Sequence, residues 1–98
     1  MAQVDLSPRA LLDLERLYGF IAPRDCRAAL AQLEGLHAAL LLLADHPLLG
    51  HEAEDGRREL VLARGRAGYV VKYRWLPRHD RVVVLTIRHQ REAGYPEE

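Results

Sequence analysis

Near its C-terminal end the chain reads Val82-Val83-Val84-Leu85-Thr86-Ile87-Arg88-His89-Gln90-Arg91-Glu92. Its first six residues are apolar or β-branched, which is typical of a strand buried in a sheet. The strand leads directly into a basic cluster formed by Arg88, His89 and Arg91. A rigid strand that carries several cations to the edge of a sheet is a suitable place to bind an anion or a backbone phosphate. We therefore expect the functional surface at this junction.

Two further strands are predicted upstream, over residues 57–64 and 69–75, and the basic-cluster strand covers 81–89. The turn between the first two, Gly65-Arg66-Ala67-Gly68, has two glycines that can adopt positive φ. Pro77-Arg78-His79-Asp80 turns the chain before the last strand. Short turns join antiparallel neighbours, so the three strands predict an antiparallel meander.

The N-terminal half predicts a short strand over residues 3–6 followed by a helical hairpin. Ser7 and Pro8 are typical of a helix start, and leucines at helical spacing indicate helices over 8–22 and 25–45. The apolar residues of the second helix exceed one narrow stripe, which favours a partner on its outer side. Residues 46–56 are expected to form a loop.

The whole chain is therefore predicted to be one α+β domain, residues 1–98, with element order β-α-α-β-β-β. The helical hairpin packs on an antiparallel sheet in this interpretation. The residues expected in the core are Leu14, Leu33, Leu40, Val71, Leu85 and Ile87.

Composition narrows the function classes. The chain has no stretch apolar enough to span a bilayer and no secretory signal at its start, so we expect a cytoplasmic protein without membrane contact. Cys26 is the only cysteine, which excludes an intrachain disulfide and a cysteine-rich metal site. We expect neither a metal ion nor a small-molecule cofactor, because no known ligand spacing or nucleotide loop is present.

The charge is divided along the chain. Residues 1–56 carry nine acidic and four basic residues, whereas residues 57–98 carry ten basic and five acidic ones. All but one of those bases are arginines, which suit bidentate contact with phosphate or carboxylate. The C-terminal half thus has the composition of a surface for an acidic partner, although arginines also decorate solvated sheets. The candidate binding residues are Arg58, Arg64, Arg66, Arg74, Arg88 and Arg91.

The same residues leave a catalytic alternative open. Metal-free RNA cleavage needs a base for the 2′-hydroxyl, cations for the phosphorane and an acid for the leaving oxygen. If the chain is a nuclease, the candidates for these roles are Arg64, His89, Arg91 and Tyr95. A binding surface needs the arginines alone.

The chain resembles the RelE/ParE superfamily of bacterial type II toxins, and in particular its ParE-like, plasmid stabilisation branch. Many short segments along the chain, in the order of the family's motifs, carry this resemblance. They begin with Leu6-Ser7-Pro8-Arg9-Ala10 and the leucine-rich second helix that ends at His46-Pro47. They continue with Arg58-Glu59-Leu60-Val61, Tyr69-Val70-Val71-Lys72-Tyr73-Arg74 and Val83 to Glu92. The resemblance implies a toxin that a cognate antitoxin neutralises.

The resemblance implies two different targets. RelE-type members cut messenger RNA in the ribosome, and ParE-type members inhibit DNA gyrase. Arg91 matches a catalytic arginine of RelE-type enzymes, and Tyr95 lies close to their C-terminal tyrosine. Val70 stands where another catalytic arginine is found, and the apolar Leu60-Val61-Leu62 replaces a strand that bears lysines.

These departures rank the hypotheses. A toxin that binds a protein target such as gyrase, without catalytic activity of its own, comes first. A ribosome-dependent ribonuclease is the alternative, and a degenerate member that retains only antitoxin binding is the third.

Overall fold

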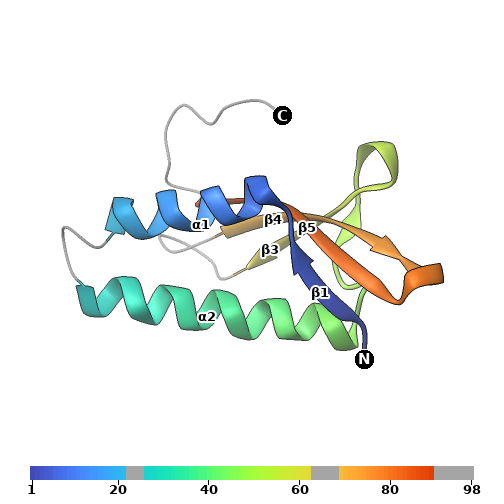
Figure 1. Cartoon of the computed structure of the whole chain (residues 1–98), viewed down its shortest axis with the longest axis horizontal. Helices are drawn as coiled ribbons and strands as arrows, with labels where there is room; N and C mark the ends of the chain where they lie inside the picture. The colour runs from blue at the N-terminus through green and yellow to red at the C-terminus, as the bar shows by residue number, and fades with distance from the viewer. Residues whose placement is uncertain (22–25, 63–68, 90–98) are drawn as a thin grey trace.

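A computed structural model describes residues 1–21, 26–62 and 69–89 of the chain. The elements follow in the order β1 (Gln3–Leu6), α1 (Pro8–Ile21), α2 (Cys26–Asp45), β2 (His51–Glu52), β3 (Arg58–Leu62), β4 (Tyr69–Leu76) and β5 (Arg81–His89). The two helices run in opposite directions, as expected for a hairpin, and pack on one sheet (Figure 1). The predicted α+β class is confirmed.

The sheet has five strands in the order β1-β5-β4-β3-β2. The pairs β3–β4 and β4–β5 are antiparallel, as predicted. The predicted antiparallel arrangement holds for β3 to β5, whereas β1 pairs with β5 in parallel and makes the sheet mixed. This pairing joins opposite ends of the chain, and no turn signal in the sequence can indicate such a contact.

The segment expected to be a loop, residues 46–56, also contributes to the sheet. Within it, β2 pairs antiparallel with β3, with His51 opposite Glu59 and Glu52 opposite Arg58. A 3₁₀ turn, Glu54–Gly56, then leads into β3, and Gly56 adopts a φ of 72° there. A strand of two residues is too short to leave an alternating pattern in the sequence.

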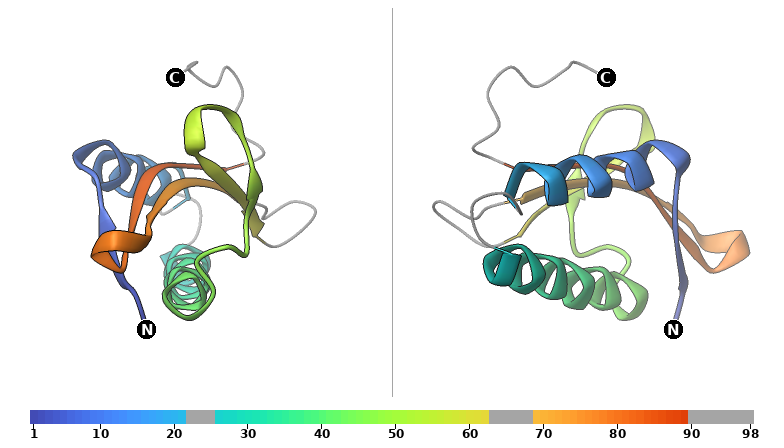
Figure 2. Two further views of the ribbon diagram at one scale, coloured as in Figure 1. Left: turned by 90° about the vertical axis from the view of Figure 1, so that its right-hand side faces the viewer. Right: turned by 60° about the vertical axis from the view of Figure 1, so that its left-hand side comes forward.

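The core lies between α2 and one face of the sheet, with α1 beside it along β5 (Figure 2). Val71 and Ile87, both expected in the core, are fully buried. Leu14 and Leu40 pack against the buried cluster, and Leu33 is partly buried. The largest fully buried side chains are Tyr73, Leu17, Leu43, Ile87, Val71, Val82 and Val84.

Leu85 is only partly buried, which corrects its predicted place in the core. Lys72 pairs with Thr86 and Tyr73 pairs with Val84, so Leu85 between them has no partner on β4. Such a bulge inserts one residue into a strand and inverts the alternation of faces beyond it. Val82 and Val84 before the bulge, and Ile87 after it, therefore all reach the core.

Beyond the end of β1, the side chains of Ser7 and of α1 form hydrogen bonds with the backbone of β5. The Ser7 hydroxyl donates to the carbonyl oxygen of Leu85 at 3.0 Å. Asp13 then accepts the backbone N–H of Ile87 at 2.9 Å, and Arg16 donates to the Ile87 carbonyl oxygen at 3.2 Å. These contacts satisfy backbone groups that a sheet edge would otherwise leave unpaired.

Neither described helix combines the length and the apolar character that crossing a membrane requires.

Candidate functional site

The face of the sheet opposite to α2 carries most of the polar side chains, and we call it the outer face. Its cross-strand neighbours follow from the register: Glu59 lies opposite Lys72, and Lys72 lies opposite Thr86. The next row toward the end of β5 contains Val61, Val70 and Arg88. The residues that define the outer face are Glu59, Val61, Val70, Lys72, Arg74, Thr86 and Arg88.

Two of the predicted binding arginines, Arg74 and Arg88, lie on this outer face. Arg58 belongs to a different environment, because it lies opposite Tyr73, whose side chain is in the core. Its guanidinium donates to the carbonyl oxygens of Leu48 and Gly50. Arg58 therefore holds the segment before β2 against β3.

The other predicted site residues fall outside the part of the chain that the structure describes, wholly or in their side chains. Arg64, Arg66, Arg91 and Tyr95 lie outside the described residues. His89 ends β5 opposite Tyr69, but its side chain is also outside the described part. Their binding or catalytic roles stay predictions.

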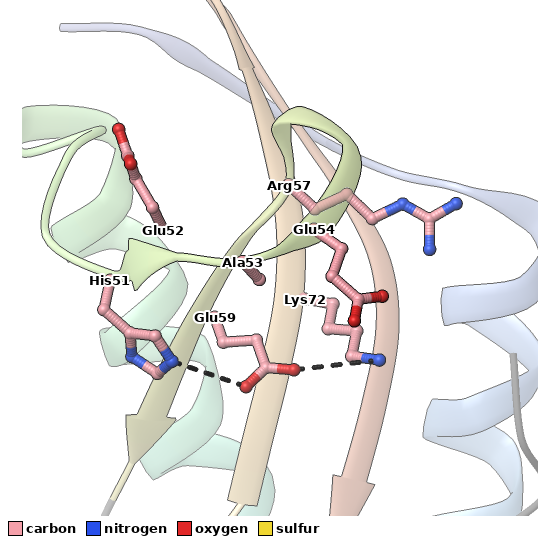
Figure 3. A pocket seen from close by; sticks show the side chains of 7 residues that line it. All are labelled: His51, Glu52, Ala53, Glu54, Arg57, Glu59 and Lys72. Carbon is pink, nitrogen blue, oxygen red and sulfur yellow. Dashed lines mark ion pairs between the residues drawn. The ribbon is translucent and has the colours of Figure 1, made fainter.

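A shallow hollow of about 470 Å³ opens on the outer face beside β2 (Figure 3). The Glu59 carboxylate joins two basic groups there. Its Oε1 lies 3.5 Å from His51 Nε2, and its Oε2 lies 3.7 Å from Lys72 Nζ. The hollow is lined by His51, Glu52, Ala53, Glu54, Arg57, Glu59 and Lys72.

The lining combines acidic and basic side chains with one alanine. None of them is a serine, threonine, cysteine or tyrosine that could act as a nucleophile. In residues 1–21, 26–62 and 69–89, no group of three or more metal-ligating side chains gathers. The His51 side chain is 65% exposed, and exposed ion pairs contribute little energy. The hollow thus offers charges of both signs to a partner.

A second depression, about 230 Å³ in volume, lies between the helices and β1 and is almost entirely apolar. It is lined by Leu6, Leu14, Leu33, Leu36, His37 and Leu40. Other leucines of the helices remain about half exposed, among them Leu11 and Leu41. An apolar groove on a protein that also exposes several leucines is typical of a surface that another protein covers.

Sequence reasoning missed Arg57, which it treated only as the start of a strand. Figure 3 shows its guanidinium directed away from Glu59 and out over the neighbouring strands. The signal that could have found it is the register of β3 against β4, which places Arg58 opposite Tyr73. That register depends on how the intervening turn is built, which the sequence leaves open.

Comparison with known proteins completes this picture. The family model of the ParE toxin of type II toxin–antitoxin systems, parDE, matches residues 4–94. The chain belongs to the ParE toxin family. This ParE-family chain is thus the toxin of a type II toxin–antitoxin system, and the resemblance to the RelE/ParE superfamily is confirmed.

Individual relatives agree with this assignment. Toxin RelE3 of Caulobacter vibrioides is 37% identical over 92 residues, which are 94% of this chain and 98% of that protein. Among solved structures, the chromosomal ParDE system from P. aeruginosa superposes with a TM-score of 0.75 at 19% identity, covering 91% of this chain and 96% of the other. The E. coli RelBE toxin–antitoxin complex superposes with a TM-score of 0.64 at 16% identity, covering 94% of this chain and 100% of the other. At these identities the structures establish the shared fold.

Proposed function

We propose that this ParE-family toxin acts by binding a protein target, DNA gyrase, and that a cognate antitoxin holds it inactive. The proposal places the toxin among binding proteins, not among ribonucleases.

One observation carries the choice of a binding mechanism. On the outer face, the row toward the end of β5 consists of Val61, Val70 and Arg88. Cleavage of RNA requires several donors arranged around one scissile phosphate. Two valines beside a single arginine leave this row with fewer donors than such a site needs, and Val61 presents an apolar side chain that is 50% exposed.

The groove between the helices supports the antitoxin as partner. It presents leucines from β1, α1 and α2 around His37, in a shape that accepts the apolar side chains of an amphipathic helix. The two solved structures described above are a ParDE system and a RelBE toxin–antitoxin complex. A similar partner for this chain is expected from the reading frame next to its gene.

The test is a supercoiling assay with purified gyrase, relaxed plasmid and ATP. The toxin should inhibit supercoiling, and prior incubation with the antitoxin should remove the inhibition. The same toxin should be added to a translating ribosome extract, in which messenger RNA is examined for cuts.

Two results would overturn the proposed target. Cleavage of ribosome-bound messenger RNA without gyrase inhibition would establish the RelE-type alternative. Binding of the antitoxin with neither effect would identify a member that retains only antitoxin binding.

A further inference from the structure

Arg74 on the outer face and Arg57, directly before β3, have no counter-ion within the described residues. The other basic groups of this region are engaged: Arg58 contacts Leu48, Gly50 and Glu52, and Lys72 contacts Glu59. Both Arg57 and Arg74 are only partly exposed, so solvent screens them less than it screens ordinary surface arginines.

The strand register brings the backbones of Arg57 and Arg74 next to each other. Arg58 pairs with Tyr73 in antiparallel fashion, so the preceding residue, Arg57, comes opposite Arg74. The Arg74 guanidinium reaches the residue before Arg57, because a Cβ built on Gly56 would lie 3.5 Å from one of its terminal nitrogens. Like charges directly opposite each other on a sheet are unfavourable unless an anion lies between them.

Buried polar atoms without hydrogen-bond partners also support a bound group here. In the described part of the chain, the buried side-chain atoms without a hydrogen-bond partner are Arg57 Nε and Thr86 Oγ1. Thr86 lies opposite Lys72, on the same face as the arginines. Buried donors without acceptors are costly, and a site for a bound group is one reason for a protein to retain them.

We propose that Arg57 and Arg74 form a clamp for a carboxylate, and that the clamp receives an aspartate or glutamate side chain of the antitoxin. This inference rests on the proposed function, since it names a contact within the antitoxin complex. A guanidinium binds a carboxylate through two parallel hydrogen bonds, so two adjacent guanidinium groups can enclose one acidic side chain.

The surroundings favour a single carboxylate over a nucleic acid strand. Glu54 lines the hollow, the exposed Asp55 follows it in the same 3₁₀ turn, and the exposed Glu52 ends β2. A nucleic acid carries a negative charge at every phosphate and would meet these acids along its path. One acidic side chain contacts the arginines alone, and basic residues of the same partner can meet the acidic rim.

The test measures antitoxin affinity for four forms of the full-length toxin by titration calorimetry. Arg57→Ala and Arg74→Ala should each weaken binding about tenfold or more, as expected when one partner of a desolvated charge pair is removed. Arg78→Ala is the matched control: Arg78 is an exposed arginine of the turn Pro77–His79, and its loss should change affinity less than twofold. Both clamp variants should also show a weaker dependence of affinity on salt than the wild type.

Melting of the free toxin separates the clamp from a structural role. Because the two charges repel each other in the free protein, each clamp variant should melt no lower than the wild type. A lower melting temperature in both variants would show that the arginines support the fold, and would overturn the inference.

Three binding results would also overturn it, for different reasons. Wild-type affinity in both clamp variants would remove the clamp while leaving the proposed function intact. A wild-type toxin that does not bind the antitoxin would refute the antitoxin partner and the clamp together. Unchanged antitoxin affinity with reduced retention of single-stranded RNA on a filter would assign the arginines to nucleic acid.

Discussion

Asp13 is the most deeply buried acidic side chain of the first helix and joins that helix to β5. It accepts the Ile87 N–H at 2.9 Å and also contacts Arg9 and Arg16 at 3.3 and 3.2 Å. We expect Asp13→Ala to lower the free energy of unfolding by about 1–3 kcal/mol, because a buried N–H loses its acceptor. Asp13→Asn retains an acceptor oxygen and should lose less. Urea denaturation of both variants checks this, and equal stability of Asp13→Ala and wild type would contradict it.

Tyr73 makes the fold sensitive to alkaline pH. Its hydroxyl donates to the Pro47 carbonyl oxygen at 2.7 Å and accepts the Gly50 N–H at 2.8 Å. Burial raises the pKa of this phenol above its usual value of 10.0. The folded state therefore favours the neutral form, so its contribution to stability is complete below pH 10 and is lost as pH rises through the raised pKa.

The variant Tyr73→Phe tests this contribution. At neutral pH it should be less stable than the wild type by about 1–3 kcal/mol, because the Gly50 N–H loses its buried acceptor. Above pH 10 the difference between the two proteins should shrink, since only the wild type carries this titrating group. Thermal melts from pH 7 to 11 measure it, and a difference that stays constant across this range would refute the argument.

At the scale of elements, two glycines allow a matched comparison. Gly50 lies where the chain enters β2, and a Cβ there would come within 2.7 Å of the Glu59 carbonyl oxygen and 2.9 Å of the Tyr73 ring. Gly35 is exposed within α2, and a Cβ there would meet nothing within 4 Å. We expect Gly50→Ala to destabilise the fold by about 1–3 kcal/mol through crowding.

Gly35→Ala should instead stabilise the helix by about 0.5–1 kcal/mol, because alanine loses less conformational freedom on folding. Chemical denaturation of both variants gives the comparison. If both glycine variants moved stability in the same direction, the close packing of Gly50 on β3 would be in doubt.

The elements also show where sequence reasoning works. The helices and β4 were predicted within a few residues, because their apolar residues recur at the helix and strand periods. The run from Val82 to Ile87 is apolar on both faces and has no period-two pattern. Its bulge at Leu85, which determines which residues reach the core, was therefore invisible in the sequence.

In the candidate site, too, local patterns predict some features and tertiary packing determines others. Alternation along β4 is enough to place Arg74 on the face opposite to the buried Val71 and Tyr73, whereas the position of Arg88 depends on the bulge in β5. The relation of Arg57 to Arg74 depends on pairing across the β3–β4 connection, and the groove between the helices depends on how α1 packs against β1. Tertiary packing determines both, and local patterns carry no record of it.

At the scale of the whole molecule, the two halves of the chain form two different surfaces. The helices and β1 build the apolar groove, and the arginine-rich second half builds the outer face. A partner that wraps around the protein can therefore use apolar contacts on one side and charged contacts on the other. A target that needs only the outer face would compete with such a partner for the arginines.

From the residues of the outer face as a whole, we predict that the toxin has no ribonuclease activity. RelE-type cleavage, as the sequence resemblance implies, needs cations on the strands that here contribute Val61 and Val70. Loss of one donor at a scissile phosphate typically costs on the order of a hundredfold in rate, so two missing donors should leave no measurable cleavage. Purified toxin added to programmed ribosomes should leave messenger RNA intact at concentrations that inhibit gyrase.

Arg88→Ala provides the control for that experiment, because Arg88 is the cation that the structure places in the Val61–Val70 row. If the toxin acts by binding, this variant should reduce gyrase inhibition and leave the messenger RNA pattern unchanged. If codon-specific cuts occurred with the wild type and disappeared with Arg88→Ala, a single arginine on this face would be catalytic. The two valines would then have been wrongly interpreted as the end of a nuclease site, and the toxin would belong with the ribosome-dependent enzymes of its superfamily.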